Sequence, residues 1–445
     1  MDRRHVVALG RRVGDGEACA MSSAEARSLP GSRLAVARYP WVLIGILWIV
    51  SFLNSADRSL LIAVMPQIRA AFALGPMQLA LINSALYWTY AVAAFLFGRL
   101  GDTSRRSRVI IAGLVFWSAA TMFVPLSTGF VMLLVLRGLV AVGEGTYYPT
   151  ATALISDWHQ PGMRSRALSV HQTAVFAGAG IGAFTAGVLG DFFGWRVPFV
   201  VFGALGLLVC VGLYKWLRDA PVSPVRAPAA SAGKPLRTVL RSAPALFLCG
   251  VFFLATGVTW GVGVWAPTYV HDRLGLDLAS SAFYGNVTVN VAGFLFVPLG
   301  GWLADWLAKR TPIGRFYALA IGLSLAGALL IPLDFVHTAQ GVGLVLLASS
   351  AGKGLFDGCI YAAVHDVVPR EARATAVGLL TMLGFFGAGL APLFVARVSE
   401  VFGMAVGLAS LAFFYFVAVG LLLATRRVTR REVRSIRLLE DAAAS

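Results

Sequence analysis

Long apolar segments recur along the whole chain and are separated by short polar loops. Each segment has about the 20 residues that an α-helix needs to cross a bilayer. The predicted fold class is therefore an all-α integral membrane protein with twelve transmembrane helices. They are predicted at about residues 41–66, 78–100, 108–126, 130–153, 167–190, 196–217, 243–269, 282–304, 315–333, 341–364, 373–396 and 402–424.

One polar segment, residues 218–241, is longer than the other internal loops and reads RDAPVSPVRAPAASAGKPLRTVLR. Its Pro, Ala and Ser content and its basic ends predict an irregular cytoplasmic linker. The linker divides the spans six and six. The predicted domains are an N-terminal cytoplasmic tail (1–40), a first six-helix bundle (41–217), the linker (218–241), a second six-helix bundle (242–424) and a basic cytoplasmic tail (425–445).

The two halves carry the same polar signatures at corresponding places. Gly98-x-Leu100-x-Asp102 closes the second span, and Gly301-x-Leu303-x-Asp305 closes the eighth. Internal repeats of six-helix units are typical of transporters that work by alternating access around a central site.

Acidic residues after the fourth and tenth spans repeat in the same way. Asp157 and Asp366 each precede an arginine by seven residues. We interpret Gly98, Asp102 and Arg106 as a gating junction at the end of a span rather than as substrate chemistry.

Composition and charge agree with a membrane protein. The chain is 58% hydrophobic and only 13% charged, whereas a soluble domain has about 25% charged residues. The net charge of +16 is explained by topology, since basic residues gather in the tails and in the loops on one side. By the positive-inside rule we expect both termini in the cytoplasm, an inner (plasma) membrane location and no nucleic-acid partner. Four arginines fall in the opposite loops: Arg69, Arg196, Arg273 and Arg397.

Motifs for enzymatic chemistry are missing from the sequence. The four cysteines have no metal-ligand spacing, and no nucleophile, metal or nucleotide motif emerges. We therefore expect no enzyme, no catalytic residue, no bound metal and no cofactor, and we expect a monomer. Residues 1–38 contain no apolar signal-peptide core, and Met21 is an alternative start.

Ionisable residues inside predicted spans are the strongest functional signal. A charge at the bilayer centre costs about 3 kcal/mol or more, so such groups are usually pathway or coupling groups. Three cations and three anions balance here, and protonating one carboxylate would leave one positive charge. This balance suits the movement of an anion together with a proton. The residues are Asp57 and Arg58 in the first span, Arg137 and Glu144 in the fourth, and Lys353 and Asp357 in the tenth.

The spacing of the first four charges predicts their partners. Asp57 and Arg58 are adjacent and point about 100° apart on a helix, so each needs a partner on another helix. A static structural ion pair is the alternative. Arg137 and Glu144 lie seven residues apart and share a helix face. They predict an open polar lining, or else a permanent pair in which Glu144 only orients Arg137.

Lys353 and Asp357 are four residues apart, within reach of each other on one helix. A buried ammonium requires a nearby anion, either Asp357 or a substrate. A local salt bridge is the alternative to a functional role.

Other polar and aromatic residues inside spans are predicted to line the substrate cavity, although each alone could be a packing or interfacial residue. They are Tyr87, Tyr90, Gln172, Trp265, Asn286 and Asn290.

From Trp41 to about Ala424 the chain resembles the major facilitator superfamily. The resemblance rests on the Gly98-x-Leu100-x-Asp102 signature, on its echo at Gly301 and on twelve spans split by a linker. The usual signature has a basic residue after the aspartate and a glycine three residues after it, where this chain has Thr103 and Arg105. The detailed contacts of the gate are therefore expected to differ from those of the superfamily.

Within that superfamily the chain is most similar to the anion:cation symporters, which carry sugar acids and other organic anions. The resemblance implies that Arg58 contacts the substrate carboxylate, that Asp57 and Glu144 are proton sites, and that Arg137 partners one of them. The matching motifs are Asn54-x-x-Asp57-Arg58, Arg137-x6-Glu144, Pro149, Ser156-Asp157-Trp158, Gly194-Trp195-Arg196 and Trp265-x-Pro267-Thr268-Tyr269.

The spinster-like lysolipid and sphingolipid transporters are the second resemblance, with drug export as a further alternative. They share the Asp-Arg pair and the Arg-x6-Glu pattern. Lys353 and Asp357 match neither family pattern, and we expect them to set specificity. The expected partners are thus a small organic anion, a proton and the lipid bilayer. The motifs that resemble spinster-like transporters are Gly101-Asp102, Phe116-Trp117-Ser118 and Trp265-Ala266-Pro267.

Overall fold

The computed structural model describes residues 30–159, 161–220, 233–369 and 372–444. Within these ranges the side chains of 30–38, 95, 98–103, 161–162, 164–166, 233–235, 374 and 437–444 are not described. The described secondary structure is helical throughout, with turns and short loops between the helices.

The first half contains α2 (Pro30–Ala63), α3 (Met65–Phe72), α4 (Pro76–Thr103), α5 (Arg106–Phe123), η1 (Val124–Leu126), α6 (Phe130–Gly145), α7 (Tyr147–Trp158), α8 (Pro161–Phe193) and α9 (Arg196–Trp216). The second half contains α10 (Gly233–Arg241), α11 (Ala243–Leu274), α12 (Leu278–Ala282), η2 (Phe283–Val287), α13 (Thr288–Ala308), α14 (Gly314–Leu330), η3 (Ile331–Phe335), α15 (Ala339–Asp357), α16 (Ile360–His365), α17 (Arg373–Phe402), α18 (Met404–Ser410), α19 (Ala412–Ala424) and α20 (Arg426–Ala444).

The twelve-span prediction agrees with the structure. Eleven helical stretches of described residues are long and apolar enough to cross a membrane. The remaining predicted span, 78–100, coincides with α4, which is 28 residues long. Several spans are built from two consecutive helices, such as α6 with α7 and α15 with α16.

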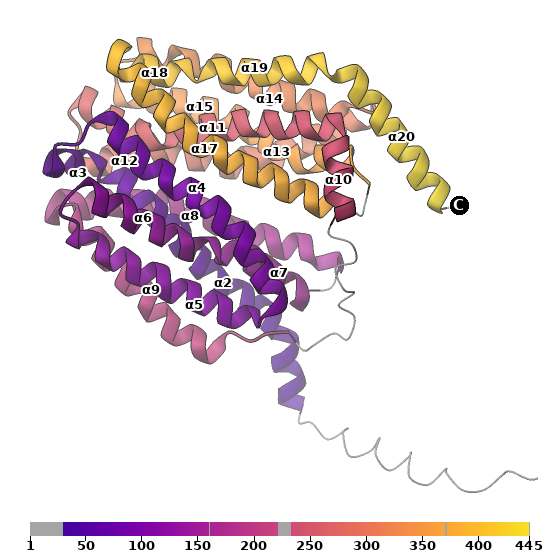
Figure 1. The fold of residues 1–445 in the computed structure, drawn as a ribbon, viewed down its shortest axis with the longest axis horizontal. Helices are drawn as coiled ribbons and strands as arrows, with labels where there is room; N and C mark the ends of the chain where they lie inside the picture. The colour runs from indigo at the N-terminus through magenta and orange to yellow at the C-terminus, as the bar shows by residue number, and fades with distance from the viewer. Residues whose placement is uncertain (1–29, 160, 221–232, 370–371, 445) are drawn as a thin grey trace, which may run out of the picture.

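The spans form two bundles that follow the sequence halves (Figure 1). The first half is drawn from indigo to magenta and the second from pink to yellow. We call the end of the bundles that carries Tyr39, Trp216 and Ala424 the terminal end, and the end that carries α3 and α12 the distal end.

The linker prediction was wrong for its last nine residues. Gly233–Arg241 forms α10 instead of an irregular segment. Pro235 lies in the first turn, where a missing N–H group is tolerated, and Val239 is fully buried. Ser242 then caps α11, because its Oγ accepts a hydrogen bond from the amide of Ala245. Residues 221–232 of the linker lie outside the described residues.

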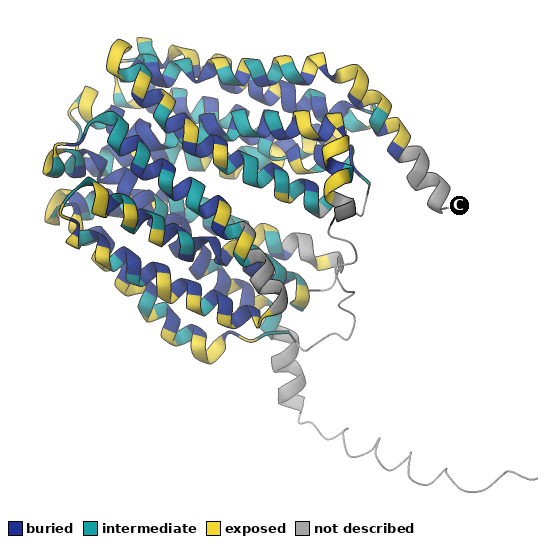
Figure 2. Ribbon diagram, viewed as in Figure 1, coloured by how far each residue is buried: buried dark blue, intermediate teal, exposed yellow. Residues whose placement is uncertain are grey.

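Figure 2 shows exposed positions along the outer helices of both bundles, and many exposed positions of the chain carry large apolar side chains. Phe192, Leu208 and Tyr214 have exposed fractions of 77%, 67% and 82%. Such surfaces are rare on soluble monomers, and lipid covers them in a membrane protein.

Polar contacts between the halves gather toward the distal end. Arg69 of the first half forms a bidentate ion pair with Asp272 of the second, at 2.6 and 2.8 Å. The Asp191 carboxylate accepts hydrogen bonds from the amides of Leu278 and Ala279, which begin α12. Near mid-span, the Trp88 indole donates to the carbonyl of Phe386.

Close packing of α2 against α8 requires glycine. A Cβ at Gly182 would lie 2.5 Å from the Cβ of Ala56 and 2.6 Å from its Cα. Helix association in lipid depends on such small residues, because lipid tails are as apolar as the helix surface.

We predict that Gly182→Ala destabilises the protein by about 1–3 kcal/mol, because the added methyl overpacks the α2–α8 contact. Gly420→Ala is the matched control, since nothing lies within 4 Å of a Cβ at that helical position. Thermal unfolding of the purified protein in detergent measures both. An equal melting temperature for the two variants would contradict the packing argument.

Candidate functional site

A buried ion pair joins α2 to α6 inside the first half. Arg58 Nε lies 2.8 Å from Glu144 Oε2, and the exposed fractions of the two side chains are 12% and 0%. Arg58 Nη2 also donates to Asn54 Oδ1, one turn earlier on α2. The guanidinium carbon lies 4.3 Å from the ring centroid of Tyr90 on α4. Arg58 is therefore held by an anion, an amide and an aromatic face from three helices.

Asp57 faces a different helix, as its position next to Arg58 predicts. Its Oδ2 accepts a hydrogen bond of 2.6 Å from Thr121 on α5. Its Oδ1 has no hydrogen-bond partner among the described residues. A small cavity beside it is also lined by Ser118, whose hydroxyl lacks a hydrogen-bond partner in the described structure.

Arg137 completes the cluster and is almost wholly buried, with an exposed fraction of 1%. Its Nε and Nη1 form no hydrogen bond with any described residue, and neither does Oε1 of Glu144. The guanidinium acts electrostatically on both Asp57 and Glu144. Glu144 thus pairs directly with Arg58 in this structure.

These four residues carry two positive and two negative charges inside the first bundle. We call Asp57, Arg58, Arg137 and Glu144 the four-charge cluster. Buried charges are tolerated only when they are compensated. Neutralising either carboxylate by a proton leaves one arginine without its counter-charge, and that arginine can then take an external anion.

A second ion pair, with a buried cation and a partly exposed carboxylate, lies in the other half. Lys353 Nζ is 2.6 Å from Asp357 Oδ1 on α15, and the exposed fractions of the side chains are 7% and 38%. The ammonium also lies 5.1 Å from the Phe356 ring centroid. The local salt bridge expected from the i,i+4 spacing is present.

A cavity of about 90 Å³ adjoins this pair and carries several polar side chains. Phe176 from the first half also lines it, so the cavity lies where the two bundles meet. Its polar lining residues are Thr259, Asn290, Ser349, Ser350, Lys353, Asp357 and Tyr415.

Asn286 and Asn290 share a face, as predicted. Asn290 Nδ2 donates to both the carbonyl and Oδ1 of Asn286, at 3.0 and 2.9 Å. Asn286 lies in the π-helical turn η2, which locally changes the helical pitch before α13. π-Turns occur frequently at functional sites, and Asn290, one turn after Asn286, lines the cavity together with Lys353.

Aromatic side chains separate the two bundles near mid-span. The Tyr87 ring lies 4.8 Å from Trp260, and the Tyr90 ring lies 4.7 Å from Phe385. The Arg58 guanidinium also lies over the face of the Tyr90 ring. The aromatic layer therefore links the four-charge cluster to α11 and α17 of the second half.

Two predicted lining residues have other partners. Trp265 is 1% exposed, and its indole donates to the carbonyl of Pro392 inside the second half. It packs α11 against α17 and offers no free polar atom to a ligand. Gln172 on α8 accepts a hydrogen bond from the Tyr148 hydroxyl on α7.

The predicted gating junction is described only in part. Arg106 forms an ion pair with Asp157, while the side chains of Gly98 and Asp102 lie outside the described residues. The second half has the same pair, because Arg315 forms two contacts with Asp366, at 2.6 and 2.8 Å. The sequence separation is 51 residues in both halves.

Several contacts were missed by sequence reasoning. Arg315 could have been found, because it follows Arg106 by 209 residues, the offset between Asp157 and Asp366. Thr121, Phe176 and Phe385 gave no comparable signal, since hydroxyl and aromatic residues are common inside apolar spans.

Two repeated six-helix bundles that enclose buried charges define a secondary transporter. The family model described as Major Facilitator Superfamily matches residues 47–392. The chain belongs to this superfamily, which makes it a multi-pass membrane transporter rather than an enzyme.

Two individual relatives are similar to the chain over most of its length. The chain is 27% identical over 390 residues to the hexuronate transporter of Bacillus subtilis, covering 84% of this chain and 92% of that protein. It is 28% identical over 400 residues to protein spinster of Drosophila melanogaster, covering 84% of this chain and 64% of that protein.

A solved structure shares the fold. It is a bacterial homologue of the human lysosomal transporter spinster in an inward-facing, unoccupied conformation. The match has a TM-score of 0.79 at 22% identity and covers 89% of this chain and 98% of that chain.

We predict that Asp357→Asn lowers the free energy of unfolding by about 1–3 kcal/mol, because it leaves the Lys353 ammonium buried without an anion. The double variant Lys353→Met/Asp357→Asn removes that unpaired charge and should recover most of the loss. Thermal unfolding in detergent measures both.

The control for this prediction is Glu400→Gln, which breaks the exposed Arg397–Glu400 pair and should change stability by less than about 1 kcal/mol. Equal losses in the single and double variants at the Lys353 site would refute the role of the unpaired ammonium.

Proposed function

We propose that the protein is a proton-coupled symporter of a small organic anion, such as a sugar acid or another carboxylate. It would work as a monomer by alternating access in the inner (plasma) membrane, with both termini in the cytoplasm. The observation that carries this proposal is the buried Arg58–Glu144 pair, in which a fully buried acid holds the cation that suits a carboxylate.

Exchange of one anion for another is the core of the mechanism. A proton neutralises Glu144, and Arg58 loses its counter-charge in a region of low dielectric. A substrate carboxylate then replaces Glu144, because a guanidinium can bind a carboxylate through two parallel hydrogen bonds. Asn54 and the Tyr90 face hold the guanidinium during the exchange. Asp57 is the second candidate proton site and is balanced by Arg137.

The second half supplies the remaining contacts. Lys353 and Asn290 line the cavity at the bundle interface, where they can contact the hydroxyl or anionic groups of a sugar acid. Asp357 holds the lysine when no substrate is bound. Tyr87, Gln172 and Asn286 remain predicted contacts near this region, whereas the buried indole of Trp265 supports the cavity wall.

Charge balance explains why substrate and proton move together. With one proton and one carboxylate bound, the interior keeps the net charge that it had when empty, so no uncompensated charge crosses the membrane core. The loaded protein can then close the distal end, where the Arg69–Asp272 contact forms, and open the terminal end. Binding must favour the occluded state for this step to proceed.

Orientation and cargo are supported by different observations. The excess of basic residues at the terminal end supports a cytoplasmic location of that end. Similarity to the hexuronate transporter over 92% of its length supports a carboxylate substrate. Similarity to protein spinster supports the alternative of lysolipid, sphingolipid or drug export.

We predict that Arg58→Ala lowers uptake of the carboxylate substrate by roughly a hundredfold, because a charge-assisted contact worth about 3 kcal/mol is lost. Arg58→Lys keeps the charge and should retain measurable uptake, while Arg397→Ala, at a residue 74% exposed, should behave like wild type. Initial uptake rates in proteoliposomes test the series. Normal uptake by a folded Arg58→Ala variant would rule out this residue as the anion site.

We predict that Glu144→Gln retains exchange of labelled for unlabelled substrate but loses accumulation driven by a proton gradient. The amide keeps the shape of the acid but cannot release a proton. Counterflow and gradient-driven uptake in the same vesicles separate the two activities. Full accumulation by Glu144→Gln would show that another group, such as Asp57, couples transport to the proton.

Uptake of labelled sugar acids and aromatic carboxylates, with and without an inward proton gradient, identifies the substrate class. Gradient-stimulated accumulation of one acid supports the symporter. Absence of uptake for every acid, together with transport of a lysolipid in the same vesicles, would support the spinster-like alternative.

A further inference from the structure

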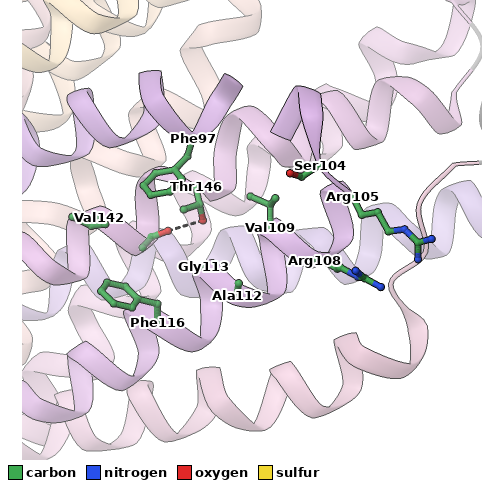
Figure 3. Close-up of a pocket in the computed structure, with 11 residues that line it drawn as sticks. Phe97, Ser104, Arg105, Arg108, Val109, Ala112, Gly113, Phe116, Val142 and Thr146 are labelled. Carbon is green, nitrogen blue, oxygen red and sulfur yellow. Dashed lines mark hydrogen bonds between the residues drawn. The ribbon is translucent and has the colours of Figure 1, made fainter. Parts of the chain in front are cut away.

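A cavity of about 680 Å³ lies between α4, α5 and the junction of α6 with α7, outside the four-charge cluster (Figure 3). Most of its lining is apolar, and no acidic side chain is among the described residues that line it. Ser104, Arg105 and Arg108 lie at one end. The other lining residues are Phe97, Val109, Ala112, Gly113, Phe116, Val142, Gly143 and Thr146.

The cavity has a polar end and an apolar end. Figure 3 shows the Arg105 and Arg108 guanidiniums at one side and Phe116 and Val142 at the other. Both arginines are exposed. The Thr146 hydroxyl donates to the carbonyl of Gly143, so its hydrogen-bond donor already has a partner. We call this cavity the slot. The lining therefore suits hydrocarbon rather than a polar solute.

The length of the slot matches one leaflet of a bilayer. Arg108 and Phe116 are eight residues apart on α5, which is about 12 Å along a helix. Half of the apolar core of a bilayer is about 15 Å thick. The arginines thus lie near the level of lipid phosphates when Phe116 lies near the middle of the bilayer.

Comparison of the two halves indicates that the gating junction, the Arg–Asp ion pair at the end of the spans, can form without Arg105 and Arg108. Arg106, between them, forms the ion pair with Asp157, and its counterpart Arg315 forms the same pair in the second half. At the offset of 209 residues, the counterparts of Arg105 and Arg108 are Gly314 and Tyr317. The second half therefore has no cation at these two positions, and its own cations in this loop, Lys309 and Arg310, lie earlier in the sequence.

We propose that this slot binds an anionic phospholipid, with its phosphate on Arg105 and Arg108 and an acyl chain along Val109, Ala112 and Phe116. Guanidinium groups bind phosphate through paired hydrogen bonds, and the leaflet on the basic side of a membrane protein is rich in anionic lipid. The lipid packs behind Gly143, the neighbour of Glu144, so its binding supports the helix that carries the candidate proton site.

The test is native mass spectrometry of the full chain in detergent, titrated with phosphatidylglycerol or with phosphatidylcholine of the same acyl chains. Inorganic phosphate is a third arm, which separates a lipid site from a free-anion site. The readout is bound lipid, so it does not depend on the proposed transport substrate. Wild type should retain phosphatidylglycerol in preference to phosphatidylcholine, and phosphate should not compete.

Three variants locate the site. Arg105→Gln/Arg108→Gln should weaken phosphatidylglycerol binding roughly 10- to 30-fold, given about 1 kcal/mol for each arginine. Arg426→Gln/Arg427→Gln removes the same charge from exposed positions of the second half and should leave binding unchanged. Ala112→Trp fills the slot from an exposed position and should reduce retention of both lipids.

Unchanged phosphatidylglycerol retention in Arg105→Gln/Arg108→Gln would overturn the proposal, as would an equal loss in the control double variant. Competition by inorganic phosphate at the same affinity would show a free-anion site and would also overturn it.

Discussion

The cost of holding charge away from water governs the interior of this transporter. Arg58 and Glu144 lie 2.8 Å apart with almost no solvent contact, and Asp57 and Arg137 are buried beside them. Removing one member of such a set is far more costly than removing an exposed charge. The helices that carry these residues, α2 and α6, must therefore keep their relative rotation. The close α2–α8 contact at Gly182 and the hydrogen bond from Thr121 of α5 to Asp57 both hold α2 in register.

The buried charge of the second half is compensated in a different way. Lys353 has one close anion, Asp357, on its own helix, and that carboxylate remains partly exposed. A pair formed within one helix can open without moving a bundle, whereas the Arg58–Glu144 pair joins two helices. The first half is thus the more rigid electrostatic unit. The second half presents an adjustable cation and a row of hydroxyl and amide groups.

Sequence reasoning predicted the two-bundle fold, the buried charges and the need for Arg58 and Asp57 to find partners on other helices. It could not name those partners. The spans are apolar on nearly every face, because lipid and protein interior are equally apolar, so hydrophobic periodicity does not give the rotation of a helix. Trp265 illustrates this limit, since its indole faces Pro392 inside the second half. The Arg69–Asp272 contact was missed because both residues lie beyond the predicted spans, Arg69 on α3 and Asp272 near the end of α11, where hydrophobic periodicity does not relate one segment to another.

The contact of Asp191 with α12 has a consequence for the motion between the bundles. A carboxylate of one half satisfies the first two amides of a short helix in the other half, and free amides at a helix start need such a partner. When the distal end opens, these amides must be hydrated or the turn must unwind. Opening therefore has a local cost at the start of α12, which loses the carboxylate that the other half supplies.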